Sequence, residues 1–465
     1  MTRIALAALL ALTVLRLVLA AVLPLTPDEA YYLLWAQHLQ PGYFDHPPMV
    51  ALWIKAGTAL CGNTPLGVRL LGPLSAALGS VLLWDAAERI APGRGLAAAL
   101  LLNATLMVGV GAIVITPDTP LLFFWTAGLA GLARLLSSGR VGWWLVVGLA
   151  AGGMLLSKYT AVLFIAAVFL WLVTSVEGRK RLATPWPWLA MLLAAGLFAP
   201  NVAWNAAHGW VSYAKQGGRE AAFNPGRAVQ FFGELVAGQA ALCTPLIAVL
   251  AGWGLWRLRR DTAPGARLVL WLSLVPGVVM LAHVLSDRVQ GNWVAILYPS
   301  ACLAAAMLPR AVLERWLKPA VGLGFGITAL AYVQAVGAPV PLPAALDTEG
   351  AQLAGWRALA AGAMAGRPAF VTADDYATMA VLAAEGPPGV MVAGFPNKWQ
   401  PRWWYFGYEP AVPPGTVGVM VTKRSDTNCD ERIGAVVRRR GAEVFATYKL
   451  CRFTAPVGGV VLPRP

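Results

Sequence analysis

The first residues with chemical potential follow the first apolar stretch of the chain, where Thr26-Pro27-Asp28-Glu29 has the pattern of a helix start. Thr26 is expected as the N-cap, Pro27 at the first helical position and Glu29 as the residue that closes a capping box. Asp28 then lies at the positive end of the helix dipole, which favours its ionised form. An ionised carboxylate can accept a proton from an attacking hydroxyl, hold a metal ion or orient a sugar.

The same tripeptide, Thr-Pro-Asp, recurs at residues 116–118, directly before another apolar stretch. Asp28 and Asp118 are therefore both predicted at helix N-termini and, from the topology derived below, on one side of a membrane. An acid in the first turn of a helix commonly only stabilises the helix dipole and accepts hydrogen bonds from the free amides. This structural role is preferred for Glu29. For Asp28 and Asp118 together a catalytic role is favoured, because polar groups at a membrane face are costly without a function.

Aromatic side chains accompany the first aspartate. Tyr31, Tyr32 and Trp35 lie three, four and seven positions after Asp28 and so share its helix face. This pattern predicts an interfacial helix with an acid at its start and an aromatic flank. Tyr31 and Tyr32 are accordingly candidates for substrate contact.

Lys158 stands between two short apolar stretches, within Ser157-Lys158-Tyr159-Thr160. A lysine there is costly unless it reaches the interface or meets an anion such as a lipid phosphate, and both interpretations are open. Tyr159 is a further candidate for substrate contact. Cations elsewhere on the same side are interpreted as lipid head-group contacts rather than catalytic groups: Arg69, Arg219 and Arg227.

A metal site is a second open interpretation. Phe44-Asp45-His46-Pro47-Pro48 places a carboxylate beside an imidazole in a rigid turn, and His208 is another ligand candidate on the same side. Asp and His are both good ligands for divalent metals. Asp45 and His46 are equally consistent with simple turn residues.

The composition requires a membrane. Hydrophobic residues make up 58% of the 465 positions and charged residues 12%, about half the charged share of a soluble chain. Apolar stretches of about 20 residues predict a polytopic, all-α bundle of about eleven transmembrane helices in residues 1–338. The expected spans are 4–25, 65–87, 95–115, 119–137, 141–157, 159–177, 186–205, 235–256, 268–285, 292–309 and 320–338.

The net charge of +14 is spread over short loops rather than gathered into one patch with aromatics, which argues against a nucleic-acid partner. The basic residues fall near the junctions between even-numbered spans and the next odd ones. This is the positive-inside pattern of a chain whose N-terminus is cytoplasmic. It places Asp28, Asp118 and the tail of the chain outside the cytoplasm.

The tail, residues 339–465, begins in a proline-rich connector and is expected to be a small α/β domain. Strands are predicted at 369–372, 389–393 and 416–422, and a helix at 374–385. Two cysteines, Cys429 and Cys451, lie in this extracytoplasmic part, where thiols can be oxidised. A disulfide between them is expected.

Together these residues resemble the GT-C superfamily, in the branch of protein O-mannosyltransferases and lipid A aminoarabinose transferases. The resembling stretches are residues 26–32, 44–48, 116–118, 156–160, 204–210 and 290–293. The resemblance implies many transmembrane helices, a polyprenyl-phosphate sugar donor and inversion at the anomeric carbon. It assigns the essential acid to Asp28, the second acid to Asp118 and a donor-phosphate contact to Lys158. Aminoarabinose transferases differ in having an arginine where Tyr31 stands and Glu-Lys-Pro where this chain has Asp-His-Pro.

The sequence therefore predicts a multi-pass enzyme of the bacterial inner membrane, with its active site and C-terminal domain facing the periplasm. It would transfer a sugar from a polyprenyl-phosphate-linked donor to a glycolipid acceptor such as lipopolysaccharide or lipid A. Membrane lipids are its other expected partners, and a divalent metal ion is an open alternative as cofactor. Two alternatives are a protein O-mannosyltransferase and a flippase of lipid-linked sugars. The flippase is disfavoured because paired broken helices in symmetric halves are not evident in the sequence.

Overall fold

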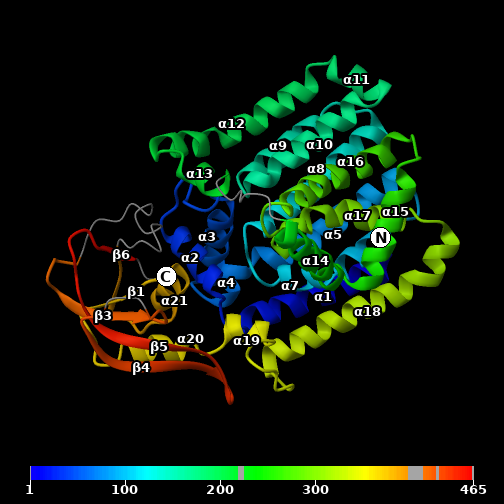
Figure 1. Cartoon of the computed structure of the whole chain (residues 1–465). Helices are drawn as coiled ribbons and strands as arrows, with labels where there is room; N and C mark the ends of the chain where they lie inside the picture. Colours follow the sequence, from blue (N-terminus) through cyan, green and yellow to red (C-terminus); the bar gives the residue numbers. More distant parts are fainter. Residues whose placement is uncertain (1, 218–224, 396–411, 426–428, 463–465) are drawn as a thin grey trace. The chain divides into compact units, whose positions relative to one another are not determined.

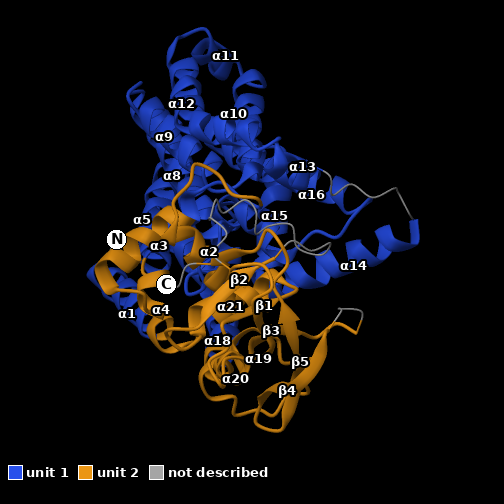
Figure 2. Cartoon of the chain, turned by 90° about the vertical axis from the view of Figure 1, so that its left-hand side faces the viewer, with its two compact units in different colours: residues 1–18, 45–50, 71–330 blue, residues 19–44, 51–70, 331–465 orange. Residues whose placement is uncertain are grey.

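The computed structural model describes residues 2–217, 225–395, 412–425 and 429–462. These form two compact units (Figures 1 and 2). The first unit contains residues 1–18, 45–50 and 71–330, and the second contains 19–44, 51–70 and 331–465. The contacts thus group the segment after the first helix with the C-terminal part of the chain, while the predicted domain boundary at residue 338 stays a prediction.

The first unit is helical. Its first and last helices run on into the second unit, and its second helix, Met49–Cys61, lies mostly in the second unit. Its helices are α1 (Arg3–Val22), α3 (Met49–Cys61), α5 (Leu71–Ile90), α6 (Gly95–Asn103), α7 (Leu106–Gly111), α8 (Asp118–Ser138), α9 (Trp143–Leu155), η1 (Tyr159–Ala161), α10 (Val162–Val173), α11 (Val176–Leu182), α12 (Trp186–Ala207), α13 (Val211–Gly217), α14 (Pro225–Leu242), α15 (Pro245–Leu258), α16 (Pro264–His283), η2 (Gly291–Leu297), α17 (Tyr298–Ala306) and α18 (Arg310–Gly337).

Six helices of the described residues are long and apolar enough to cross a membrane, or up to eight spans if each of two bent helix pairs is one span. The predicted count of about eleven is not confirmed. The expected span at 95–115 is divided into α6 and α7, because the Thr105 hydroxyl accepts the Val108 N–H and starts a new helix. The expected span at 141–157 contains only the 13-residue α9, and that at 292–309 begins as the 3₁₀ helix η2.

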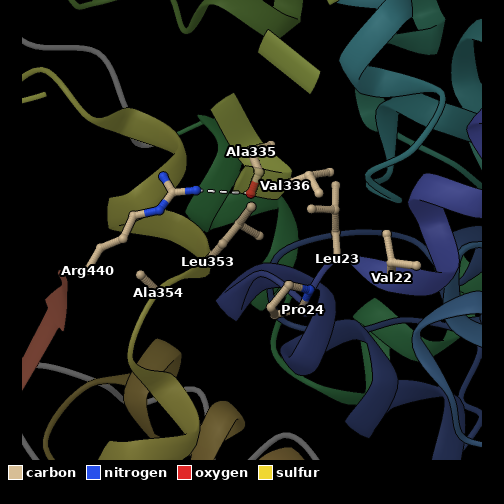
Figure 3. Close-up of a pocket in the computed structure, with 8 residues that line it drawn as sticks. All are labelled: Val22, Leu23, Pro24, Ala335, Val336, Leu353, Ala354 and Arg440. Atoms are coloured by element: carbon tan, nitrogen blue, oxygen red, sulfur yellow. Dashed lines mark hydrogen bonds between the residues drawn. The ribbon is translucent and has the colours of Figure 1, made fainter. Parts of the chain in front are cut away.

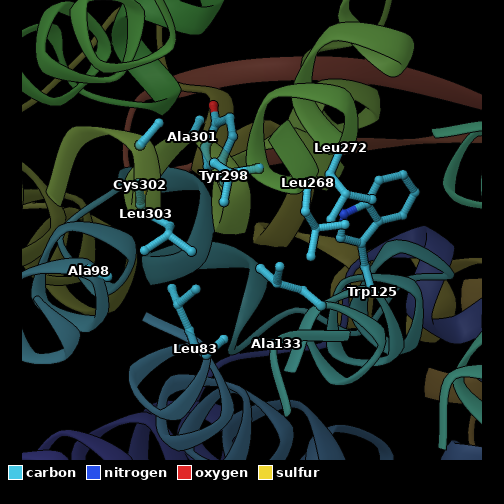
Figure 4. Close-up of a cluster of buried hydrophobic side chains, with 14 of the residues drawn as sticks. Leu83, Ala98, Trp125, Ala133, Leu268, Leu272, Tyr298, Ala301, Cys302 and Leu303 are labelled. Atoms are coloured by element: carbon cyan, nitrogen blue, oxygen red, sulfur yellow. The ribbon is translucent and has the colours of Figure 1, made fainter. Parts of the chain in front are cut away.

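The core of the first unit is an apolar cluster between α5, α6, α8, α16 and α17 (Figure 4). Leu83, Trp125 and Leu303 are fully buried within it. Small residues bring neighbouring helices close together. A Cβ added at Gly148 of α9 would lie 2.7 Å from the carbonyl oxygen of Ala190 in α12, so only glycine fits there.

The second unit combines short helices with a six-stranded sheet in the order β4-β5-β3-β1-β2-β6. β1 is parallel to both β2 and β3, and the other pairs are antiparallel. Its elements are α2 (Pro27–Gln37), α4 (Pro65–Arg69), α19 (Thr348–Leu353), α20 (Trp356–Ala363), β1 (Phe370–Ala373), α21 (Tyr376–Glu385), β2 (Met391–Gly394), β3 (Val417–Thr422), β4 (Glu431–Arg440), β5 (Glu443–Thr454) and β6 (Val460–Leu462).

The α/β character of the tail is confirmed. The three predicted strands and the predicted helix appear as β1, β2, β3 and α21. β1 is buried along its whole length, as expected for a central strand covered on both faces. The expected disulfide is also present, with the Cα atoms of Cys429 and Cys451 5.4 Å apart.

Candidate functional site

Lys158 and Asp118 form a largely buried ion pair in the first unit. Asp118 is the first residue of α8, as the sequence predicts, and Lys158 lies in the extended segment between α9 and η1. The Lys158 Nζ donates to Asp118 Oδ1 at 2.7 Å and to Oδ2 at 2.9 Å. The two side chains are 8% and 14% exposed, so neither reaches bulk water freely. The lysine therefore meets an anion of the protein itself.

Asn292 of η2 completes this cluster. Its Nδ2 donates to Asp118 Oδ2 at 2.6 Å, and the ring of the neighbouring Trp293 has its centroid 5.8 Å from the Lys158 Nζ. At that separation an aromatic ring contributes a weak cation–π attraction. Asn292 and Trp293 were not predicted as site residues, although the stretch at 290–293 was part of the resemblance.

The arrangement suits a lysine that binds an anionic ligand. The Asp118 carboxylate accepts three hydrogen bonds, which favours a positioning role over proton transfer. An ammonium has three N–H donors. Among the described residues, its hydrogen-bond acceptors are the two oxygens of Asp118, so one N–H is left to meet a ligand oxygen.

Tyr159 faces helix α12. Its hydroxyl is 3.5 Å from Asn201 Oδ1 and 3.4 Å from Asn205 Nδ2, and its ring packs edge-on against Tyr213. Burial, as the larger cause, and the neighbouring Tyr159, as the smaller one, raise the pKa of the Tyr213 phenol to about 12. Tyr213 therefore stays protonated at neutral pH and cannot act as a base. The predicted contact between Tyr159 and substrate stays a prediction.

Asp28 belongs to the second unit. The expected capping box is present: Thr26 Oγ1 accepts the Glu29 N–H, and Glu29 Oε2 accepts the Thr26 N–H. Asp28 is exposed at the start of α2, and its Oδ1 accepts a hydrogen bond from the Tyr376 hydroxyl at 2.9 Å. An exposed carboxylate at a helix N-terminus can serve as a base or as an orienting group.

The two tyrosines after Asp28 are core residues of the second unit. Tyr31 is 2% and Tyr32 7% exposed, and both pack edge-on against Trp35 with ring centroids 4.9 Å away. The Tyr31 ring also lies 5.0 Å from the ring of Tyr376. Their burial supports a role in fixing α2, and the predicted contact with substrate stays a prediction.

The Arg69 side chain is enclosed in the second unit. It is 1% exposed and forms an ion pair at 2.6 Å with the buried Glu29. Its predicted contact with substrate or a lipid head group stays a prediction. All five N–H groups of its guanidinium are used, by both oxygens of Glu29 and by three backbone carbonyls. Arg69 thus ties the end of α1 to the start of α2. Arg219, the other predicted arginine, lies outside the described residues.

The predicted metal ligands are not gathered. Within the described ranges, no group of three or more His, Cys, Asp or Glu side chains could hold a metal ion. The His208 Nδ1 is 2.7 Å from the carbonyl oxygen of Trp204, and its ring stacks on that tryptophan. Asp45 is buried and its backbone carbonyl accepts a hydrogen bond from Gln216. Metal binding at Asp45, His46 and His208 stays a prediction.

A pocket of about 220 Å³ lies in the second unit where α1 and α18 end (Figure 3). It is smaller than the usual ligand site of about 300–1,000 Å³. Its polar wall is Arg440, which donates to the carbonyls of Gln334 and Ala335 and pairs with Asp347. Arg440 thus caps the end of α18. The pocket residues are Val22, Leu23, Pro24, Ala335, Val336, Leu353, Ala354 and Arg440.

Comparison with known proteins places this geometry in context. Residues 45–204 match the family model of dolichyl-phosphate-mannose-protein mannosyltransferase. The lipid A galacturonosyltransferase RgtD of Rhizobium johnstonii is 30% identical over 292 residues, which are 60% of each chain. The resemblance to the GT-C superfamily is confirmed. The lipopolysaccharide core galacturonosyltransferase RgtA of the same organism is 29% identical over 41% of this chain and 39% of its own length.

Solved structures show the fold. ArnT from Cupriavidus metallidurans bound to undecaprenyl phosphate matches with a TM-score of 0.68 at 16% identity, over 96% of this chain and 97% of ArnT. Its apo state matches with a TM-score of 0.66. The chain thus has an ArnT-like fold, and with its apolar helices it is a multi-pass membrane protein. It spans about 60% of the length of RgtD and 39% of that of RgtA.

Proposed function

We propose that this chain is an inverting glycosyltransferase that moves a sugar from a polyprenyl-phosphate donor to a glycolipid acceptor of the lipid A or lipopolysaccharide type. The acceptor class is that of the two relatives, whose names describe transfer of galacturonic acid to lipid A and to the lipopolysaccharide core. The carrier lipid follows from the GT-C resemblance and agrees with the ligand of the ArnT structure. Galacturonic acid is the first sugar to test.

The observation that carries the proposal is the partly buried cluster of Lys158, Asp118 and Asn292. A lysine whose ammonium is held by a carboxylate, itself fixed by an asparagine, is preorganised to meet the oxygen of a lipid phosphate. Such fixed charges stabilise a leaving group most effectively in a site with little water. In this mechanism Lys158 contacts the donor phosphate. Asp118 holds the ammonium in place, and Asn292 holds Asp118.

Asp28 is assigned to the acceptor. The bond between the anomeric carbon and the donor phosphate breaks, the acceptor oxygen bonds to that carbon from the opposite face, and the phosphate leaves on its carrier lipid. Asp28 takes the proton of the acceptor hydroxyl. An acceptor that is itself a phosphate needs no base, and Asp28 then orients it. The mechanism contains no step that depends on a metal.

We further propose that the site faces the periplasm of a bacterial inner membrane. The support is the distribution of arginine and lysine over alternate loops, which follows the positive-inside rule with the N-terminus in the cytoplasm. The extracytoplasmic position of the tail also suits the Cys429–Cys451 disulfide.

The test is a transfer assay with the purified protein in proteoliposomes, using a polyprenyl phosphate carrying radiolabelled galacturonic acid and purified lipid A. Label should appear in lipid A, and free polyprenyl phosphate should accumulate in equal amount. Lys158→Met should reduce transfer at least about 100-fold, while Lys180→Met, which removes a 72% exposed lysine, should not.

Three results would overturn the proposal. Label in added protein acceptors would identify a protein glycosyltransferase. Movement of the intact donor across the bilayer without release of polyprenyl phosphate would identify a flippase. Full activity of Lys158→Met would remove the lysine from the mechanism.

A further inference from the structure

Tyr376 lies at a position that the topology of the C-terminal sheet determines. β1 is the central parallel strand, and the chain leaves its carboxyl end through Asp374 and Asp375 into α21. Asp375 caps this helix, since its Oδ1 accepts the Thr378 N–H at 2.9 Å and its Oδ2 accepts the Thr378 hydroxyl at 2.7 Å. The cap fixes Tyr376 as the first residue of the helix.

The order of the strands around β1 makes this edge of the sheet a usual place for functional groups. In the sheet order β4-β5-β3-β1-β2-β6, the chain goes from β1 to β2 on one side and from β3 to β4 on the other side. The carboxyl ends of β1 and β3 therefore form a topological switch point, which is where open α/β domains usually place functional groups. A tyrosine at this edge is well placed to contact a functional group.

What Tyr376 contacts is the proposed acceptor-side aspartate. Its hydroxyl donates to Asp28 Oδ1 at 2.9 Å, across 348 positions of sequence. Its ring lies 5.0 Å from that of Tyr31 at an interplanar angle of 60°, and Tyr31 is itself 2% exposed. α2 and α21 pack together around this contact. The buried ring of Tyr31 thus holds the Tyr376 phenol in place against the exposed Asp28 carboxylate.

We propose that Tyr376 is a positioning residue for Asp28, so that the C-terminal domain takes part in the transfer reaction. This inference rests on the proposed function. A hydrogen bond from a phenol to a carboxylate fixes the rotamer of the acid and stabilises its ionised form. Both effects serve a group that must meet an acceptor hydroxyl in one geometry. A displacement of about 1 Å at such a group can reduce the rate about 100-fold.

The test compares Tyr376→Phe with Tyr448→Phe. Tyr376→Phe keeps the ring that packs on Tyr31 and removes only the hydroxyl. Tyr448→Phe removes a buried phenol from β5 of the same domain, beside Trp356, and controls for loss of domain stability. In the lipid A transfer assay, kcat of Tyr376→Phe should fall about 10- to 100-fold with KM within about twofold. Tyr448→Phe should keep the wild-type kcat.

A second readout does not depend on activity. The shift in unfolding temperature caused by Tyr376→Phe is measured in wild type and in Asp28→Ala, as a double-mutant cycle. The shift should be present in wild type and absent in Asp28→Ala. Equal shifts in the two backgrounds would show that the hydroxyl does not interact with Asp28.

The outcomes separate this inference from the proposed function. An active wild type with an unchanged kcat in Tyr376→Phe overturns the positioning role and leaves the proposed function standing. An equal loss of kcat in Tyr376→Phe and Tyr448→Phe shows a structural role and overturns the positioning role. A raised KM with unchanged kcat in Tyr376→Phe overturns it as well. A wild type that transfers no sugar overturns the proposed function and the positioning role with it, whatever the cycle shows.

Discussion

The buried pair Arg69–Glu29 makes the sharpest prediction about stability. The two side chains are 1% and 0% exposed, and both oxygens of Glu29 lie 2.6 Å from guanidinium nitrogens. Arg69→Met leaves a buried carboxylate without its cation and three carbonyls without donors. Removing one partner of a buried ion pair costs about 3–5 kcal/mol, and we expect a loss of that size in the free energy of unfolding.

The assay is denaturant unfolding in mixed micelles, followed by tryptophan fluorescence. The matched control is Arg310→Met, which breaks an i,i+4 pair with Glu314 whose side chains are 86% and 63% exposed. That change should cost less than about 0.5 kcal/mol. The double variant Arg69→Met/Glu29→Leu should regain part of the loss, because no uncompensated charge remains buried.

Transfer kinetics decide between the two interpretations of Arg69. If Arg69→Met unfolds like wild type but raises the KM for the lipid donor, the arginine binds the lipid head group and the structural role is refuted. If stability falls while the KM of the folded fraction is unchanged, the structural role holds. The lipid contact expected from the sequence and the structural role indicated by the ion pair thus predict opposite results in the same experiment.

Three further predictions concern other contacts. Asn292→Ala should lower kcat for transfer about tenfold by loosening Asp118. Wild-type kcat in both Asn292→Ala and the conservative Asn292→Gln would contradict this. Cys429→Ser or Cys451→Ser should lower stability by about 2–4 kcal/mol, and alkylation of both thiols in non-reduced wild type would show that the bridge is absent. Gly148→Leu should disrupt the contact between α9 and α12 and yield little folded protein, which size-exclusion chromatography in detergent measures.

Features encoded by neighbouring residues were predictable from sequence. The capping box at Thr26 and Glu29 depends on residues three positions apart, so its pattern is visible in one stretch of chain. The same holds for Asp118 at the start of α8 and for the strand β3. Local hydrogen bonds and periodicity need no knowledge of the fold.

Contacts between distant residues were not predictable in this way. Lys158 and Asp118 are 40 positions apart, and Asn292 is 174 positions from Asp118, so the packing of α8 against α9 and against η2 is needed to bring them together. The same holds for Arg69. The sequence does not reveal that Glu29 lies 2.6 Å away, so the arginine was interpreted as a lipid contact.

The expected count of spans is not confirmed, and one reason is physical. Hydropathy detects an apolar stretch but not a break inside it, and Thr105 starts a new helix within such a stretch. Strands β4 and β5 were missed because both are half exposed and rich in charge, as in Arg438-Arg439-Arg440. Their apolar alternation is too weak to stand out.

The most direct test of the central claim is a cryo-electron microscopy structure of the protein with polyprenyl phosphate bound. A phosphate oxygen is expected within hydrogen-bond distance of the Lys158 Nζ, with Asp118 still holding the ammonium and Asn292 still bonded to Asp118. A phosphate bound elsewhere, with Lys158 contacting only Asp118, would contradict the account.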